Sequence, residues 1–193
     1  MFRRKSHEKL NLLIILVVPI FLLVSTPNYG HARFQTGDFL LDASTSAGVV
    51  STEIIIEDAD NPRHSIIGLN FRGRSLVTSR FFWGANLSLH ADIYEDHDDM
   101  TNVRMAGCLG FLLTPNSPTS LYASLDAGMW AWDFDYADAD GPTVGVEIGL
   151  ITHLTERLYL DTHFLVRHTE LNIEGEDFEI VQDGLQIGLG YRF

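Results

Sequence analysis

The sequence predicts an all-β protein: an eight-stranded antiparallel up-and-down β-barrel that crosses a membrane and is preceded by a cleavable signal peptide. Three observations lead to this prediction. The N-terminal segment has the pattern of an export signal, and the rest of the chain alternates apolar and polar residues with period two. Along the chain, the links between these stretches alternate between short ones and acidic ones. No stretch after Ala32 fits a convincing amphipathic helix.

The first part of the chain has the features of a secretory signal. Basic residues precede an apolar-rich run over residues 10–24, which is 15 residues long. A helix needs roughly 20 residues to span a bilayer. Small residues stand at the two positions that a signal peptidase requires, so we expect cleavage after Ala32. The predicted domains are a signal peptide, 1–32, and a barrel, 33–193, with an uncleaved inner-membrane anchor as the alternative.

The composition argues against several kinds of partner and bound group. Residues 33–193 hold nine basic and 25 acidic residues and no lysine, a net charge of -16. This balance argues against a nucleic-acid partner. Cys108 is the single cysteine, so no intrachain disulfide can form. We predict no cofactor. Asp138, Asp140 and Glu147 match a calcium loop in part, but Tyr136 stands at its first ligand position, so we predict no dedicated metal site.

Eight stretches alternate with period two and are the predicted strands. In the third, Trp83 and Leu87 share one face, while Asn86 and Ser88 share the other. Runs of about 10 to 14 residues are long for a soluble protein and suit tilted membrane strands. The predicted strands cover residues 37–49, 64–73, 80–94, 102–113, 119–132, 143–154, 157–170 and 180–193.

The two faces of these strands differ in a way that indicates which side meets lipid. One face is a continuous set of large apolar residues, and the other mixes glycines with charges of both signs. Lipid outside and a narrow polar lumen fit this pattern better than the alternative, a soluble lipocalin-like barrel. Backbone groups in lipid have no water to bond, so the sheet must close on itself. An eight-stranded interior is filled by side chains, which predicts a plug and no open pore.

The links give the barrel an orientation. Those after the second, fourth and sixth strands, 74–79, 114–118 and 155–156, are short, whereas those after the odd-numbered strands are acidic. With both termini in the periplasm, the short turns lie there and the acidic loops face outward. The arginines expected at or near the periplasmic rim are Arg33, Arg72, Arg74, Arg80, Arg157 and Arg192.

The last nine residues alternate up to the final Phe193. Their ending, G-L-G-Y-R-F, resembles the terminal strand of small bacterial outer-membrane barrels of the OmpA/OmpX type. The resemblance implies a location in the outer membrane of a Gram-negative bacterium. It also implies that Leu189, Tyr191 and Phe193 belong to the signal that the barrel-assembly machinery reads during insertion.

Register predicts ion pairs inside the barrel. The predicted placements on neighbouring strands are Asp42 opposite Arg72, Asp92 opposite Arg104, and Glu147 near His163 and within diagonal reach of Arg167. We expect these pairs to fix strand register. Cys108 falls on the lumen face, where we expect an inert core residue.

The aromatic residues near the two ends have a predicted role and one open alternative. Trp83, Trp130 and Trp132, with Tyr191 and Phe193, suit the aromatic girdles of a membrane barrel. Alternation, however, places Trp130 and Trp132 on the lumen side. Either they plug the outer mouth, or a bulge near Gly128 flips the register.

Similar barrels include lipid A deacylases and palmitoyltransferases, which use a Ser with a His and an acid. Ser88, His90 and Asp92 share one strand face. Residues two apart in a strand lie about 7 Å apart, beyond the roughly 2.6–3.2 Å that a Ser–His pair needs. We predict a non-enzymatic structural or surface-interaction protein, with a lipid-modifying enzyme or a small pore as alternatives. We expect its acidic rim to gather Mg²⁺ or Ca²⁺ and to bridge to lipopolysaccharide phosphates.

Overall fold

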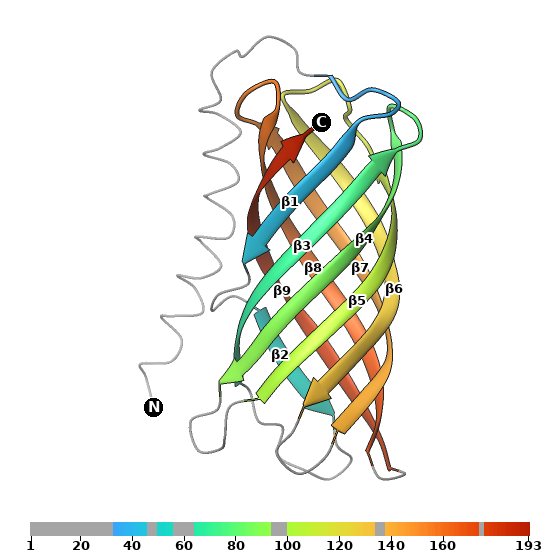
Figure 1. The fold of residues 1–193 in the computed structure, drawn as a ribbon, viewed down its shortest axis with the longest axis vertical. Helices are drawn as coiled ribbons and strands as arrows, with labels where there is room; N and C mark the ends of the chain where they lie inside the picture. Colours follow the sequence, from blue (N-terminus) through green and yellow to red (C-terminus); the bar gives the residue numbers. More distant parts are fainter. Residues whose placement is uncertain (1–32, 46–49, 56–63, 94–99, 134–137, 174–175) are drawn as a thin grey trace, which may run out of the picture.

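The computed structural model describes residues 33–45, 50–55, 64–93, 100–133, 138–173 and 176–193. These residues form one closed antiparallel sheet (Figure 1). Within those ranges, no helix is both long enough and apolar enough to cross a membrane. The predicted signal peptide lies outside the described residues.

The strands follow one another around the barrel in chain order. From β3 to β9 each strand pairs with the next, and β9 closes the sheet against β1 and β2, which both also pair with β3. β1 and β2 therefore share one position, and the eight-stranded antiparallel barrel is confirmed. The strands are β1 Phe39–Thr45, β2 Val50–Ile55, β3 His64–Leu76, β4 Phe81–Ile93, β5 Met100–Leu112, β6 Thr119–Asp133, β7 Asp138–His153, β8 Leu158–Ile173 and β9 Glu176–Arg192.

The first barrel position differs from its prediction as a single strand over 37–49. Thr45 pairs with Leu69 of β3, whereas Ser51 pairs with Ser65, so the register of β2 is two residues away from a continuation of β1. The predicted strand ends at residue 49 because three polar residues, Ser51, Thr52 and Glu53, follow soon after and break the apolar alternation. Glu53, predicted in a loop, lies in β2.

Strands also extend further than predicted at the end where the acidic links stand. β7 begins at Asp138 and β9 at Glu176, and β8 ends at Ile173. Acidic residues of the predicted links therefore belong partly to strands, because backbone pairing continues past the apolar segment that identified each strand.

The barrel is apolar outside and polar inside. Leu125 and Met105 are 62% and 65% exposed on the outer face, whereas Arg74 and Arg104 in the lumen are completely buried. A water-soluble fold shows the reverse distribution. The exposed apolar face is that of a barrel surrounded by lipid.

The three short links and both ends of the barrel chain lie together, at an end that we call the turn end (top in Figure 1). The opposite end is the loop end. Two of the turns have the same hydrogen bond. Thr78 Oγ1 accepts a hydrogen bond from the amide of Phe81, and Thr155 Oγ1 accepts one from the amide of Leu158, both with a length of 2.9 Å. Side-chain acceptors of this kind satisfy amides that the ladder leaves free.

Apolar side chains close the lumen at the turn end. We call this cluster the turn-end plug; its members are Phe34, Leu40, Leu76, Phe82, Cys108, Leu112, Tyr122, Ile151 and Tyr159. Lumen-facing glycines make room for its rings: a Cβ on Gly110 would lie 2.1 Å from the Phe82 ring, and one on Gly190 would lie 2.1 Å from the Tyr159 ring. Cys108 is buried in this plug as a free thiol.

Candidate functional site

Below the turn-end plug, the lumen holds a set of charged side chains contributed by β1, β3, β5, β6, β7 and β8. We call it the lumen network; its members are Asp42, Arg72, Arg74, Arg104, Asp126, Glu147, Asp161, His163 and Arg167. None is more than 4% exposed. Four carboxylates face four guanidinium groups, so the ionised members are balanced. Buried charges persist when each is paired and hydrogen-bonded in this way.

Arg72 stands at the centre of the network. It lies opposite Asp42 in the β1–β3 register, and its Nη2 is 3.1 Å from Asp42 Oδ1. Its guanidinium also reaches across the lumen, with Nη1 2.8 Å from Glu147 Oε2 and Nη2 2.8 Å from Asp161 Oδ2. One arginine from β3 thus joins acids on β1, β7 and β8.

Arg74 connects the network to the turn-end plug. Its Nη2 lies 2.7 Å from both Asp42 Oδ2 and Asp161 Oδ2, and its guanidinium carbon is 5.2 Å from the centroid of the Tyr122 ring. The sequence placed both arginines near the periplasmic rim and Arg72 in a lumen ion pair with Asp42; that pair is present, and Arg74 also points into the lumen. They share a strand face, so alternation turns the two side chains the same way.

The network continues toward the loop end through Arg167 and Arg104. Arg167 Nη2 is 3.1 Å from Glu147 Oε1, the diagonal contact that the sequence predicted. Asp126 accepts a hydrogen bond from Arg104 and lies near Arg167. Asp126 was not among the predicted site residues.

The predicted placement of Asp92 opposite Arg104 is wrong. Asp92 pairs with Met100, and Arg104 pairs with Ser88. β5 begins at Met100, before the predicted strand start, which moves the centre of the hairpin and shifts the register by four residues. The side chain of Asp92 lies outside the described part of the chain.

The hydrogen-bond partners of His163 differ from the predicted neighbour, Glu147. Its Nδ1 lies 3.1 Å from Asp161 Oδ1 and its Nε2 lies 3.0 Å from Gln186 Oε1. No hydrogen bond joins His163 to Glu147 among the described contacts, although both side chains line one cavity. The prediction was based on the β7–β8 hairpin alone and did not include β9.

Ser88 and His90 do not form a nucleophile–base pair. Both are buried in the lumen, and the His90 Nε2 lies 3.3 Å from Asn70 Oδ1. The Ser88 hydroxyl has no hydrogen-bond partner in the described structure. The described residues also contain no group of three His, Cys, Asp or Glu side chains that could hold a metal ion.

Trp130 lies inside the barrel and is fully buried. Its Nε1 donates a 2.7 Å hydrogen bond to Asn102 Oδ1, and its ring packs edge-on against His90. Alternation continues through Gly128, so of the two alternatives the lumen-side position of Trp130 is confirmed, and the bulge that would place it in a girdle is wrong. The side chain of Trp132 lies outside the described residues.

Trp83 and the C-terminal aromatic residues lie on the outer face, as the girdle prediction requires. Trp83 is 56% exposed, and the Tyr191 and Phe193 rings pack against each other with centroids 4.8 Å apart. Phe193 continues the closure of the barrel, because its amide donates to the carbonyl of Phe39.

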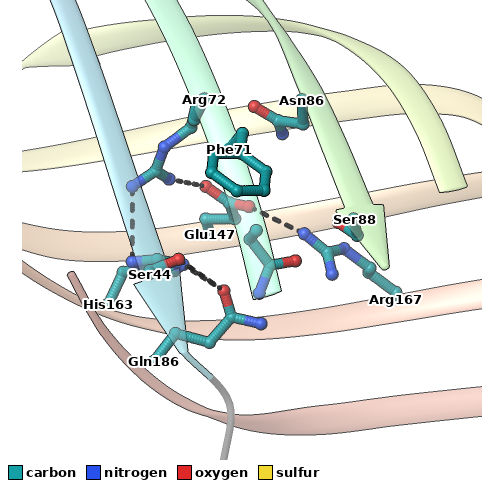
Figure 2. Close-up of a pocket in the computed structure, with 10 residues that line it drawn as sticks. Ser44, Phe71, Arg72, Asn86, Ser88, Glu147, His163, Arg167 and Gln186 are labelled. Atoms are coloured by element: carbon teal, nitrogen blue, oxygen red, sulfur yellow. Dashed lines mark hydrogen bonds and ion pairs between the residues drawn. The ribbon is translucent and has the colours of Figure 1, made fainter. Parts of the chain in front are cut away.

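A small cavity lies within the network (Figure 2). Its lining includes Arg72, Glu147, His163, Arg167 and Gln186. The space open to the centre of a water-sized sphere is about 10 Å³. A site of this size holds about one water molecule. The cavity is therefore far too small for the passage of a solute.

Comparison with known proteins relates this architecture to one class. No protein-family model matches the chain, and no curated protein sequence does. Among solved structures, it is similar to the outer membrane protein OprG from Pseudomonas aeruginosa, with 15% identity over 85% of this chain and 99% of that one, and a TM-score of 0.55.

Two further structures have the same fold. Neisserial surface protein A is 12% identical over 81% of this chain and 99% of its own, with a TM-score of 0.61. Ail, the attachment invasion locus protein of Yersinia pestis, is 14% identical over 82% of this chain and 100% of its own, with a TM-score of 0.53. The resemblance to small outer-membrane barrels is thereby confirmed at the level of the fold.

Proposed function

We propose that this chain, which has the fold of the small outer-membrane barrels, is an outer-membrane protein of a Gram-negative bacterium with a structural or surface-interaction role. The observation that carries the proposal is the filled lumen. The turn-end plug and the lumen network occupy the interior, so contacts with other molecules fall to the two ends and the lipid face. Ail and Neisserial surface protein A, whose names describe attachment and surface location, support the same role.

The turn end faces the periplasm in this proposal and the loop end faces the exterior. Export with a signal peptide that ends at Ala32 delivers the chain to the periplasm, and the barrel then inserts with its termini on that side. Short periplasmic turns and longer outer connections are the usual arrangement of bacterial barrels. The acidic connections then meet the environment.

Cysteine labelling in intact cells tests this orientation. A bulky maleimide that cannot cross the outer membrane should label Glu179→Cys, at the loop end, and should label Ser79→Cys, at the turn end, only after lysis. Both positions are exposed. Native Cys108, buried in the turn-end plug, serves as the internal control that stays unlabelled. Labelling of the turn-end variant alone in intact cells would overturn the orientation.

Lipopolysaccharide is the proposed partner of the loop end. Glu170 and Glu179 are exposed and stand directly opposite each other on β8 and β9, and exposed Asp140 lies on neighbouring β7. Like charges opposite each other destabilise a strand pair. Divalent cations relieve that repulsion and link these carboxylates to lipid phosphates by non-specific, screened attraction.

The partner proposal predicts a thermal midpoint that depends on both lipopolysaccharide and Mg²⁺. The purified barrel in vesicles that contain lipopolysaccharide should unfold at a higher temperature with Mg²⁺ than with EDTA. The double variant Glu170→Gln/Glu179→Gln should lose most of the difference, whereas Glu156→Gln, exposed at the turn end, should keep it. Equal midpoints with and without Mg²⁺ in the unsubstituted protein would reject this partner.

The alternative of a lipid-modifying enzyme has no described feature in its favour, because Ser88 and His163 have no arrangement suited to attack on an ester. An assay of lipid A deacylation and acyl transfer decides the question. The unsubstituted protein should show no more activity than Ser88→Ala or His163→Gln. Activity that both substitutions abolish would establish the enzyme in place of the surface role.

A further inference from the structure

The cavity in the lumen network has a lining short of hydrogen-bond acceptors. Four of its buried uncharged side chains have a donor without a partner in the described structure: Asn70 Nδ2, Asn86 Nδ2, Ser88 Oγ and Gln186 Nε2. None of the four residues is more than 6% exposed. Buried polar groups are almost always hydrogen-bonded, so these donors indicate an occupant that accepts hydrogen bonds.

The donors come from three of the strands that line the cavity (Figure 2). Asn70 is on β3, Asn86 and Ser88 are on β4, and Gln186 is on β9. Two bonds already fix the Gln186 amide, because its Oε1 faces His163 Nε2 at 3.0 Å and the Ser44 hydroxyl at 3.4 Å. Its free N–H group is thereby left for the cavity.

The charges on the lining favour an anion over a neutral molecule. Arg72 and Arg167 contribute two positive charges and Glu147 contributes one negative charge. The carboxylate is already occupied, because Glu147 accepts from Arg72, Arg167 and the Ser124 hydroxyl. The three charged groups on the lining therefore sum to one positive charge, while Asp42, Asp126 and Asp161, which pair with the same arginines, do not line the cavity.

We propose that this cavity is a binding site for one small monatomic anion of the halide class, such as chloride. A single water molecule accepts about two hydrogen bonds and must also donate, whereas a halide ion only accepts and can take several donors at once. Two acceptors on the lining have no partner in the described structure, Asn86 Oδ1 and the Ser88 hydroxyl oxygen. The first turns away from the ion when the amide presents its Nδ2, and the second donates its hydrogen to the ion. The site is independent of the proposed surface role, since it lies in the middle of the barrel.

Refolding in two salts tests the proposal. The purified barrel in detergent is refolded in sodium chloride and in sodium gluconate at equal ionic strength, and its thermal midpoint is measured. A ligand that binds only the folded state raises the midpoint in proportion to the logarithm of its concentration above the dissociation constant. Chloride should raise the midpoint and gluconate, which is too large for the cavity, should not.

Direct location of the ion completes the test. Crystals grown in sodium bromide should show an anomalous scattering peak between Asn86, Ser88 and Gln186. Water density at this place without anomalous signal, together with equal midpoints in the two salts, would overturn the proposal.

Variants separate the cavity from general salt effects. Ser88→Ala and Asn86→Leu each remove a donor and should abolish the difference between chloride and gluconate. Thr152→Val is the control, because Thr152 lies in the lumen near the turn end and hydrogen-bonds to Thr119, away from the cavity. A chloride effect that survives in both cavity variants contradicts the site, and if Asn86→Leu does not fold, Ser88→Ala and the bromide peak still decide.

Discussion

Arg72 is the single side chain whose contacts reach furthest around the barrel. It binds Asp42, Glu147 and Asp161, which stand on three different strands. Replacing it by glutamine leaves three buried carboxylates short of a cation. Breaking one buried ion pair typically costs about 3–5 kcal/mol.

We therefore expect Arg72→Gln to lower the free energy of unfolding by about 3–5 kcal/mol, measured by urea unfolding in detergent. Arg80→Gln is the matched control, because Arg80 is exposed in a turn and contacts the Phe111 ring. Its unfolding curve should match that of the unsubstituted protein. Equal losses in both variants would mean that the lumen contacts contribute no more than a surface arginine.

Two glycines of β5 offer a comparison of the two barrel faces. A Cβ on Gly110 would lie 2.1 Å from the Phe82 ring, whereas one on Gly107, which faces lipid, would have its nearest neighbour at 3.9 Å. Gly110→Ala must displace a packed ring, and overpacking of this kind costs about 1–3 kcal/mol. Gly107→Ala should unfold at the same urea concentration as the unsubstituted protein or higher, and the reverse ranking would contradict the packed plug.

At the scale of strands, the sequence was sufficient to predict the facing of side chains and insufficient for the register. Trp83 and Leu87 lie outside and Asn86 and Ser88 inside, because alternation depends on neighbouring residues alone. Register depends on where each hairpin turns. The polar residues before Met100 do not reveal that point, so Arg104 was assigned the wrong partner.

Arg104 and Asp126 provide the test of whether lumen pairs hold strand register. A double-mutant cycle with Arg104→Gln and Asp126→Asn should give a coupling of about 0.5–3 kcal/mol in urea unfolding. The double variant should then be less destabilised than the two single losses added together. Additive losses would show that the two strands are held by their backbone ladder alone.

The last strand carries a prediction about assembly. Phe193 is 68% exposed and packs edge-on against Tyr191 at the lipid face, so its removal leaves the interior intact. If Leu189, Tyr191 and Phe193 are read during insertion, Phe193→Ala should reduce the amount of barrel in the outer membrane and leave unfolding in detergent nearly unchanged. Phe111→Ala, on the same face of β5, is the control that should insert normally. Equal insertion of all three proteins would remove the signal role.

For the whole molecule, the contacts that cross the lumen were beyond prediction from the sequence. Alternation does place Asp161 and Arg74 on inward faces, but these residues belong to β8 and β3, which are not neighbours in the sheet. Their contact exists because the sheet closes to a small radius, and hairpin registers contain no information about that closure. For the same reason, the Tyr122 hydroxyl donates to Asp161 and the Tyr159 hydroxyl donates to Asp42, although neither pair lies on neighbouring strands.

A filled barrel predicts little current. In a planar bilayer, the purified protein should give no steady conductance above that of the lipid, since the turn-end plug and the lumen network fill the described lumen with side chains. The same measurement is made on Gly110→Ala, which disturbs the turn-end plug, and on Arg72→Gln, which disturbs the lumen network. Stable openings of uniform size in the unsubstituted protein would favour the alternative of a small pore.

The balance of charge inside the barrel has a consequence for the electrostatic interaction between neighbouring copies of the protein. The four carboxylates and four guanidinium groups of the lumen network cancel, so the net charge of -16 over residues 33–193 is carried by the rest of the chain. Two barrels side by side in one membrane therefore repel each other over roughly 10 Å at 0.1 M salt. Their lateral spacing should shrink as ionic strength rises, and crowded patches should form only where counterions condense between them.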